Sequence, residues 1–396
     1  MQYHISDKIA PLKPSAIREI FKYAGSNDVI SLAGGNPAFE TLPVEDIRKL
    51  TAEVLEQESK TVLLYSQSAG HIPLRNALKD YLSRRYGFLK EYDDLMVTTG
   101  AQQCMDLTCK VLCNEGDTVI CEDPSFIGSL NCFRSYNTNL VGIPMEEDGI
   151  HLGKLEEALK TEKNVRFIYL IPNFQNPTGI TMSLEKRKAV YALAKQYDVM
   201  ILEDNPYGDL RFEGEELPCV KSFDEDGRVV YAGSFSKILS TGIRVGYLVA
   251  PQELMAKLEV AKQCTDVHTS MIAQLLCHRF LTERDIDAHI SGIKGVYAHK
   301  CGLMLKEMDD RFPKSVTYAR PQGGLFLWVT LPEGMDGGEY ATRLVKEHKV
   351  CVVPGSAFSV REVPSSRNIR LNFSSSTDEE IITGITKCAQ LLKDML

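Results

Sequence analysis

The sequence has no long hydrophobic run and no excess of basic charge. No uncharged apolar stretch approaches the roughly 20 residues that a membrane-spanning helix needs. Acidic residues outnumber basic ones by 53 to 45, and the net charge of −8 argues against nucleic-acid partners, which require a basic surface. The first residues also lack the apolar core of a secretion signal. We therefore expect a cytoplasmic protein with neither a nucleic-acid nor a membrane partner.

The eleven cysteines include no C-x-x-C pair. The tightest group is Cys104, Cys109 and Cys113, and its spacing matches neither zinc nor plant-type iron–sulfur patterns. A disulfide framework is typical of short secreted chains, not of a chain this long without a signal. We read the cysteines as core or surface thiols rather than metal ligands, and we expect no metal site.

Several catalytic and nucleotide-binding motifs are missing. The chain has no G-x-G-x-x-G after a strand, no G-x-x-x-x-G-K-[ST], no G-x-S-x-G and no H-E-x-x-H. Their absence argues against a dinucleotide fold, a P-loop, a serine hydrolase and a zinc protease. The eight histidines are scattered, and we read them as structural or surface residues.

Short apolar strands alternate with amphipathic helices from about residue 95 onward. This pattern predicts an α/β fold with a three-layer, mostly parallel sheet covered by helices on both faces. The predicted strands are 95–99, 118–123, 165–172, 199–204, 228–234 and 245–251. The predicted helices of this part are 43–58, 73–87, 101–113, 152–160 and 183–198.

After about residue 290 the pattern changes to a smaller α+β unit. A helix is predicted over 295–312, strands follow up to 374, and a last helix covers 377–396. The length of 396 residues allows one large domain with a smaller companion. We predict an N-terminal segment 1–42 that packs with the small domain, a large domain 43–289 and a small C-terminal domain 290–396.

Polar residues gather where the predicted strands end. Ligands of open parallel sheets bind outside the carboxyl ends of the strands. Each of these residues alone is also explained by turn chemistry, but together they predict a site at one edge. They are Gly100, Asp123, Asn173, Asn176, Asp204, Ser234 and Lys237.

The stretch "TGAQQ" (99–103) ends a strand and opens a helix. Backbone N–H groups and the helix dipole at such a place suit a phosphate. Ser234, Ser236 and Arg244 would add hydroxyl donors and a bidentate fork. An ordinary turn with capping serines is the alternative for "TGAQQ" alone, and the downstream serines and arginine favour the anion site.

Lys237 and Asp204 are the candidate reactive pair. A lysine amine must lose its proton to attack an aldehyde, and burial near a cation such as Arg244 lowers its pKa. A surface lysine at a helix start is the alternative, which the helix dipole disfavours. Asp204, at a buried strand end, needs a cationic partner such as a protonated pyridine nitrogen, or else caps a helix.

Four further side chains could complete a site for a flat, charged ligand. Asn176 and Tyr207 could donate to a ring oxygen, and Phe126 could stack on the ring. Arg370, in a strand-like run of the small unit, could grip a carboxylate with both guanidinium nitrogens. An ion pair on the sheet surface is the alternative for Arg370.

With these residues in place, the chain resembles the fold-type I, pyridoxal-phosphate-dependent aminotransferases of class I/II. The nearest branch contains 2-aminoadipate and kynurenine aminotransferases and the aminotransferase-like domains of GntR-type regulators. The resemblance covers nearly the whole chain and runs through "SLAGGNP" (31–37), "YSQSAGHIPLR" (65–75), "TTGAQQ" (98–103), "EDPSF" (122–126), "PNFQNPTG" (172–179), "EDNPY" (203–207), "GSFSK" (233–237), "GIRVGY" (242–247), "RPQGGLFLW" (320–328) and "NIRLNF" (368–373).

The resemblance implies pyridoxal 5'-phosphate as cofactor and a role for each matching residue. Lys237 would bond to the cofactor aldehyde and move the substrate proton, with Asp204 and Tyr207 as further catalytic residues. Arg370, Asn176 and Gly35 would bind the substrate α-carboxylate. The residues implied to contact the cofactor are Tyr65, Gly100, Ala101, Gln102, Phe126, Asn176, Asp204, Tyr207, Ser234, Ser236, Lys237 and Arg244.

Three further features follow from the resemblance. Tyr65 would reach the phosphate of the neighbouring subunit, which implies a homodimer with shared active sites. The Asn176–Pro177 bond is expected to be cis. Arg18, in the N-terminal helix, would meet a distal substrate carboxylate or simply face solvent.

The implied function is transfer of an amino group from an α-amino acid to a 2-oxo acid, such as 2-oxoglutarate, by a ping-pong mechanism. A β-lyase or decarboxylase on the same scaffold is the first alternative. A non-catalytic ligand-sensing domain of a regulator is the second, and it is disfavoured because the aminotransferase pattern starts near residue 14. The identity of the donor amino acid is not predicted.

Overall fold

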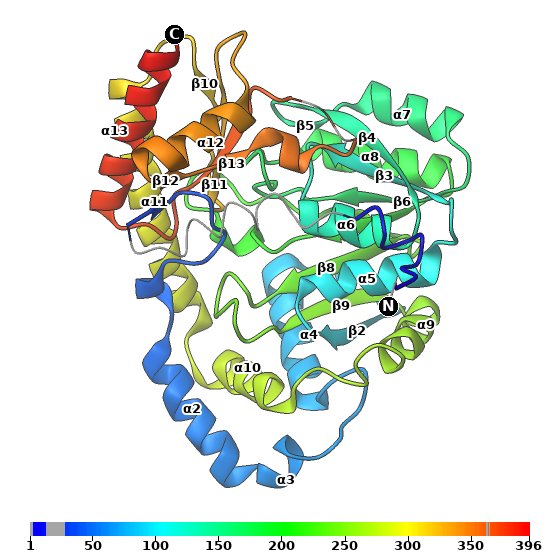
Figure 1. Cartoon of the computed structure of the whole chain (residues 1–396). Helices are drawn as coiled ribbons and strands as arrows, with labels where there is room; N and C mark the ends of the chain where they lie inside the picture. Colours follow the sequence, from blue (N-terminus) through cyan, green and yellow to red (C-terminus); the bar gives the residue numbers. More distant parts are fainter. Residues whose placement is uncertain (1–2, 13–27, 362, 364) are drawn as a thin grey trace.

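A computed structural model describes residues 3–12, 28–361, 363 and 365–396 of the chain. Its centre is an eight-stranded sheet with the order β2-β9-β8-β7-β6-β3-β4-β5 (Figure 1). The strands are β2 (Asp93–Thr98), β3 (Thr118–Asp123), β4 (Asn139–Glu146), β5 (Gly149–Ile150), β6 (Val165–Leu170), β7 (Met200–Asp204), β8 (Val229–Ser234) and β9 (Gly246–Pro251).

The sheet is mostly parallel, and only β9 and β5 run antiparallel to their neighbours. The carboxyl ends of β2, β3, β6, β7 and β8 therefore meet at one edge, as the sequence predicts. Asp204 pairs in register with Ala232, and Ser234 pairs with Gly246. This register places the ends of β7 and β8 side by side, so that Asp204 and Ser234 come to the same edge.

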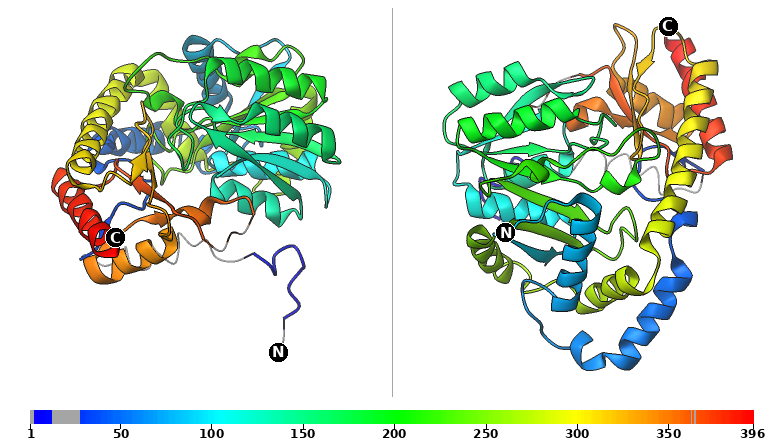
Figure 2. Two further views of the ribbon diagram at one scale, coloured as in Figure 1. Left: turned by 90° about the horizontal axis from the view of Figure 1, so that it is seen from above. Right: turned by 180° about the vertical axis from the view of Figure 1, so that it is seen from behind.

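Helices cover both faces of the large sheet, which confirms the three-layer α/β prediction (Figures 1 and 2). Successive residues of β3 point to opposite faces. Val119 packs in the core shared with α5 and α6, whereas Ile120 packs in the core shared with α7 and α8. The helices are α2 (Val44–Gln57), α3 (Ser59–Val62), α4 (Ile72–Tyr86), α5 (Ala101–Leu112), α6 (Ile127–Ser135), α7 (Leu152–Thr161), α8 (Leu184–Gln196), α9 (Gln252–Gln263) and α10 (Met271–Glu283).

A second, four-stranded sheet has the order β10-β11-β14-β13 and is antiparallel throughout. Its strands are β10 (Thr317–Tyr318), β11 (Phe326–Thr330), β13 (Val353–Pro354) and β14 (Asn368–Asn372). The helices of this part are α11 (Ile286–Arg311), α12 (Gly337–His348) and α13 (Asp378–Met395). β1 (Ile30–Ser31) pairs in parallel with β12 (Val350–Cys351), so the N-terminal segment lies against this part of the chain.

Four short 3₁₀ turns complete the described elements. They are η1 (Phe39–Thr41), η2 (Gly208–Leu210), η3 (Val220–Phe223) and η4 (Gly355–Phe358).

Most predicted elements are present, and the differences have local causes. Helix α11 begins at Ile286 rather than near 295, because Asp285 caps it by accepting from the backbone N–H of Ala288 at 2.9 Å. The sequence pattern also missed the strands β1, β4 and β5 and the helices α3, α6, α9, α10 and α12. α6 begins directly after Phe126, and the backbone N–H of Ser129 donates to the Phe126 carbonyl oxygen. Its polar and apolar residues do not follow the helical period there, so the sequence pattern does not indicate this helix.

A buried ion-pair triad fixes β2 to the segment that follows β7. Lys221 Nζ lies 2.8 Å from Asp93 Oδ1 and 2.7 Å from Asp224 Oδ2, and all three side chains are fully buried. Glu203 accepts from the backbone N–H groups of Val220 and Lys221 at 2.9 and 2.7 Å. The triad therefore holds the start of the strand whose end carries Gly100.

We expect Lys221→Met to lower the free energy of unfolding by about 3–5 kcal/mol, because it leaves two buried carboxylates without a cation. Lys79→Met is the matched control. Lys79 forms an ion pair with Asp94 at 2.8 Å on the half-exposed surface, where loss of a pair costs only about 0–1 kcal/mol. Urea titrations of both variants test this, and equal destabilisation by the two substitutions would contradict it.

Candidate active site

A cavity of about 290 Å³ opens at the carboxyl edge of the large sheet, against β11 and β14. Its lining joins three parts of the chain that are far apart in sequence. The predicted residues in the lining are Gly35, Ala101, Gln102, Phe126, Asn176, Asp204, Tyr207, Ser234, Ser236, Lys237, Arg244 and Arg370. The lining residues that sequence reasoning missed are Met105, Ser129, Ile171, Pro206 and Phe326.

One end of the cavity is built to hold an anion. Gly100 precedes α5 with φ +74°, and a Cβ there would lie 2.3 Å from Arg244 Nη2, so only glycine fits. Arg244 Nη1 donates to Ser236 Oγ at 3.4 Å, and Ser234 Oγ donates to the same oxygen at 2.9 Å. The first N–H groups of α5 have no partner within the helix. Together with the guanidinium, they can bind a doubly charged phosphate.

Asp204 lies at the opposite end, at the end of β7, and is almost fully buried. Its Oδ2 accepts from the Tyr169 hydroxyl at 2.8 Å, and Tyr169 in turn accepts from Ser129 Oγ at 2.8 Å. Its Oδ1 has no hydrogen-bond partner among the described residues. Burial raises the pKa of Asp204 to about 7, and the hydrogen bond from Tyr169 opposes that rise.

The Oδ1 oxygen of buried Asp204 needs a hydrogen-bond donor, preferably a cationic one, and none of the described residues supplies it. A protonated ring nitrogen of a ligand in the cavity meets this need. The anion cradle at the other end and the unpaired carboxylate here therefore fit a phosphorylated pyridine, which carries both groups.

The Lys237 amine lies between these two ends. Its Nζ donates to the carbonyl oxygen of Gly35 at 2.6 Å. Burial, together with the positive charges of Arg370 and Arg244, lowers the pKa of Lys237 to about 8. A neutral amine, which can attack a carbonyl carbon, is therefore well populated near pH 8.

Arg370 closes the cavity from β14 and is 3% exposed. Its Nη1 donates to Asn176 Oδ1 at 2.9 Å and its Nη2 donates to the carbonyl oxygen of Ala33 at 2.6 Å, whereas its Nε has no partner in the part of the chain that the structure describes. Its guanidinium carbon lies 4.1 Å from the centre of the Phe326 ring. Within the described residues, Arg370 forms no ion pair with a carboxylate, so its charge is free for an anionic ligand.

Asn176 and Tyr207 come together above the sheet edge. Asn176 Nδ2 donates to the Tyr207 hydroxyl at 3.4 Å. The pKa of Tyr207 is raised by burial and by the charge of Asp204, so the phenol remains protonated. The Asn176–Pro177 bond is cis, as predicted, and Asp123–Pro124 is a second cis bond that was not predicted.

Phe126 lies at the start of α6 and faces the cavity. A Cβ on Gly128 would lie 2.6 Å from its ring, so this glycine makes room for Phe126. Gln102 Nε2 donates to the carbonyl oxygen of Gly128 at 3.0 Å, which ties the start of α5 to α6.

Among the described residues that the sequence predicts at the site, those that do not line the cavity are Gly100, Asp123, Asn173 and Tyr65. Tyr65 is 90% exposed, and its ring meets the edge of His268 with 6.0 Å between ring centres. Arg18 lies outside the described residues, so its role remains a prediction.

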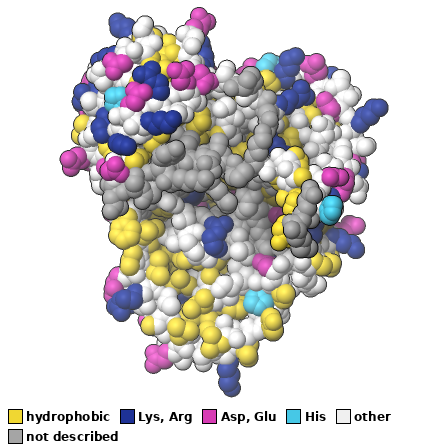
Figure 3. Space-filling model, in the orientation of Figure 1, with side chains coloured by type: hydrophobic (Ala, Val, Ile, Leu, Met, Phe, Trp, Pro, Cys, Tyr) yellow, Lys and Arg dark blue, Asp and Glu magenta, His cyan; other side chains and the backbone are white. Residues whose placement is uncertain are grey.

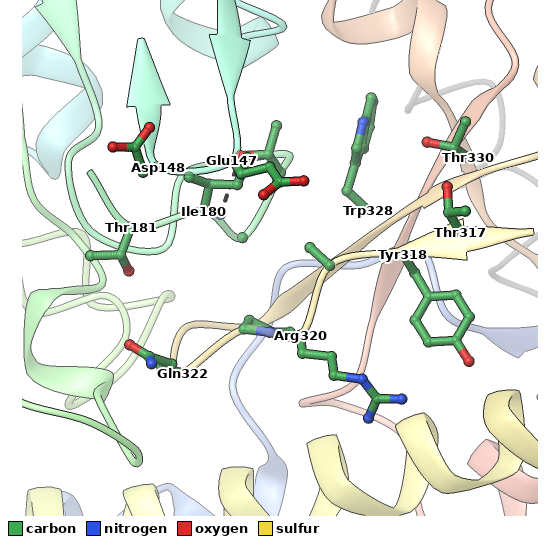
Figure 4. A pocket seen from close by; sticks show the side chains of 14 residues that line it. Glu147, Asp148, Ile180, Thr181, Thr317, Tyr318, Arg320, Gln322, Trp328 and Thr330 are labelled. Carbon is green, nitrogen blue, oxygen red and sulfur yellow. Dashed lines mark hydrogen bonds between the residues drawn. The ribbon is translucent and has the colours of Figure 1, made fainter. Parts of the chain in front are cut away.

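A second cavity, of about 560 Å³, lies between residues 178–181 and the strands β10 and β11 (Figure 4). Two of its charged groups are already paired, since Arg320 binds Asp309 and Asp148 binds Lys186. Trp328 projects into it from β11. Because the smaller cavity holds the unpartnered Asp204 oxygen and Arg370 nitrogen, we identify that cavity as the candidate active site.

Two further searches concern only the described part of the chain. No helix there combines the length and apolar character that crossing a membrane demands. Among the same residues, no three His, Cys, Asp or Glu side chains gather closely enough to hold a metal ion.

Comparison with known sequences places the chain in a family. The sequence model described as "Aminotransferase class I and II" matches residues 27–387. Aromatic-amino-acid aminotransferase 1 of Thermococcus litoralis is 41% identical over 400 residues, covering 99% of this chain and 94% of the relative. The 2-aminoadipate transaminase of Thermus thermophilus is 36% identical over 388 residues, covering 97% and 95%.

Solved structures agree. The kynurenine aminotransferase of Pyrococcus horikoshii, in complex with PMP, superimposes with a TM-score of 0.95 at 37% identity, covering 99% of this chain and 97% of that one. LysN, the α-aminoadipate aminotransferase of Thermus thermophilus, complexed with N-(5'-phosphopyridoxyl)-L-leucine, gives 0.91 at 34% identity, covering 99% and 97%. The chain therefore belongs to the class I and II aminotransferases, pyridoxal-phosphate-dependent enzymes that transfer amino groups from amino acids.

Proposed function

We propose that the chain moves the amino group of an α-amino acid to 2-oxoglutarate in two half-reactions at the 290 Å³ cavity. One observation carries this assignment to the cavity. A lysine amine with a lowered pKa lies between an anion cradle and a buried arginine that has no carboxylate partner among the described residues.

We assign the cofactor-binding roles as follows. The backbone N–H groups of Ala101 and Gln102 bind the phosphate with Ser234, Ser236 and Arg244, and Gly100 allows that approach. Asp204 pairs with the ring nitrogen, Asn176 and Tyr207 donate to the ring oxygen, and Phe126 stacks on the ring. When bound, the cofactor supplies an aldehyde that bonds to the amino group and a ring that takes up electrons from Cα. The support for these roles is the unpaired Asp204 Oδ1, the close packing of Gly100 on Arg244, and the lining itself.

Lys237 has two tasks in this proposal. Its amine holds the cofactor aldehyde between turnovers and, once an amino substrate has taken that place, accepts the proton at the substrate Cα. A base with a pKa near the working pH does this best, because it is both populated and able to take the proton. The pKa of about 8 for the Lys237 amine supports this role.

The α-carboxylate of either substrate binds Arg370, with Asn176 and the Gly35 backbone beside it. The guanidinium is already oriented by its bonds to Asn176 Oδ1 and the Ala33 carbonyl, at 2.9 and 2.6 Å. A carboxylate would satisfy its Nε and offset the cost of burying its charge. The Phe326 and Phe358 rings, 4.1 and 5.0 Å from the guanidinium carbon, exclude water from one side.

The domain division stays part of the proposal. We divide the chain into the segment 1–42, a large domain 43–289 and a small domain 290–396. The two separate sheets support this division, as does the pairing of β1 with β12. α11 (Ile286–Arg311) runs across the second boundary.

We further propose a homodimer with shared active sites, in which Tyr65 reaches the partner's phosphate site. Apolar side chains on the lower half of the molecule in Figure 3 remain exposed. Burying such a surface against a second copy would remove it from water. The exposed residues that we assign to this interface are Leu55, Leu63, Leu64, Tyr65, Ile72, Val267 and Ile272.

The location that we propose is the cytoplasm. All eleven cysteines are free and eight of them are buried in the core, and a reducing compartment suits such a chain.

We expect Lys237→Ala to lower kcat at least about 10³-fold, because it removes both the covalent anchor and the base. A panel of L-amino acids with 2-oxoglutarate, read as glutamate formed, measures this. Lys257→Ala, on the exposed face of α9, is the control and should keep wild-type rates. Ammonia release without any oxo acid would instead favour a lyase, and full activity of Lys237→Ala would remove the proposed mechanism.

We expect the amine of Lys237 in the apoenzyme to react with acetic anhydride with a midpoint near pH 8, because it is mainly protonated below that pH and mainly neutral above it. Peptide mass spectrometry of the 233–247 region follows the reaction. Free Nα-acetyl-lysine, whose side-chain amine has a pKa of about 10.4, is the reference. Arg370→Met should move the midpoint upward, since it removes a positive charge that disfavours the protonated amine. A midpoint equal to that of the reference would refute the lowered pKa.

We expect Leu64→Asp to raise the dimer dissociation constant at least about 100-fold and to weaken cofactor binding. The substitution places a charge twice in a symmetric interface that would otherwise bury leucine. Sedimentation at several protein concentrations measures the shift. Leu396→Asp is the matched control, since Leu64 and Leu396 are 65% and 67% exposed. A Leu64→Asp variant that sediments like this control would argue against the proposed interface.

A further inference from the structure

A buried lysine lies behind the anion cradle and does not line the cavity. Lys262, near the end of α9, has a fully buried side chain. Its Nζ donates to Gln103 Oε1 at 2.8 Å, to Asp266 Oδ1 at 2.9 Å and to Thr269 Oγ1 at 3.1 Å. A buried ammonium group needs such acceptors, and here they come from α5 and from the segment after α9.

The same three side chains also form hydrogen bonds with Thr99, the residue before Gly100. The backbone N–H of Thr99 donates to Gln103 Oε1 at 2.8 Å. Its hydroxyl donates to Asp266 Oδ2 at 2.7 Å and lies 3.1 Å from Thr269 Oγ1. Lys262 is therefore the centre of a network that grips Thr99 through both its backbone and its side chain.

The Lys262 network contacts the turn at residues 99–100 from one side, and Arg244 contacts it from the other. Arg244 packs directly on Gly100, which has φ +74° and no room for a Cβ. The chain at residues 99–100 is thus held from the back by the Lys262 network and from the front by the arginine. The direction of the next N–H groups, those of Ala101 and Gln102, depends on this turn.

We propose that Lys262 is a positioning residue for the cofactor phosphate, which aims the N–H groups of the "TGAQQ" turn at the phosphate oxygens. The inference rests on the cradle assigned under the proposed function. Its action is geometric rather than a long-range attraction, because Asp266 neutralises the lysine charge at 2.9 Å. Lys262 orients the Gln103 amide, whose oxygen accepts from both Lys262 and the Thr99 backbone.

The alternative is a lysine that only stabilises the fold by neutralising Asp266. The two roles differ in one measurable quantity, the preference of the apoenzyme for pyridoxal 5'-phosphate over pyridoxal. A phosphate-positioning residue affects only the phosphorylated ligand. A residue needed only for folding affects both ligands alike.

The test titrates the apoenzymes of the wild type and Lys262→Met with pyridoxal 5'-phosphate and with pyridoxal, read by absorbance. We expect Lys262→Met to raise the Kd of pyridoxal 5'-phosphate about 10-fold, the scale of one lost charge-assisted hydrogen bond at the phosphate. The Kd of pyridoxal should change less than about 2-fold, within the error of such contact estimates. Inorganic phosphate should compete correspondingly less well with the variant. Lys257→Met, exposed on the same helix, should match the wild type for both ligands.

Thr99→Val gives an independent reading if Lys262→Met does not fold. It keeps the shape of this exposed residue and removes only the hydroxyl bonds to Asp266 and Thr269, so we expect a smaller loss, about 3-fold, again only for the phosphorylated ligand. Equal weakening of both ligands, or no weakening, would overturn the inference while leaving the cradle intact. A wild type that binds pyridoxal as tightly as its phosphate would remove the cradle itself.

Discussion

The active site depends on charged groups that the protein buries without completing their partnerships. Asp204 keeps one carboxylate oxygen unpaired, Arg370 keeps one guanidinium nitrogen unpaired, and the Lys237 amine is held by a single carbonyl. Burying such groups opposes folding unless a ligand completes them. The contacts of the surrounding sheet and helices offset that cost in the free energy of folding. A ligand that pairs with these charged groups removes the cost, and this gain favours its binding.

Three separate parts of the chain must meet for this arrangement to exist. The large sheet brings Asp204 and Lys237, the antiparallel sheet brings Arg370, and the N-terminal segment brings the carbonyls of Ala33 and Gly35. Lys237 and Arg370 are each held by an atom from another of these parts. Arg370, for example, donates both to Asn176 beyond β6 and to Ala33. Closing the cavity is therefore inseparable from completing the fold.

The sequence indicated the strand ends and the residues that follow them, because the alternation of short strands and helices puts those ends at one edge. It did not indicate the Ser129–Tyr169–Asp204 chain, since Tyr169 sits within an apolar strand and reads as core, and its hydroxyl partner is set by the register of β3, β6 and β7. Lys262 reads as an ordinary charge on a helix until its burial is known. Phe326 reads as a strand residue of a distant sheet. The role proposed for Tyr65 involves a second chain, and Arg18 lies outside the described residues.

Trp328 is the only tryptophan of the chain and lies in the cavity between the two sheets (Figure 4). Its indole packs edge-on to Phe358, whose ring also lies 5.0 Å from the Arg370 guanidinium carbon. Any displacement of the antiparallel sheet relative to the large one changes the polarity around this indole. The single indole of the protein thus lies where the two sheets face each other, and its emission spectrum would report such a displacement in solution without an attached dye.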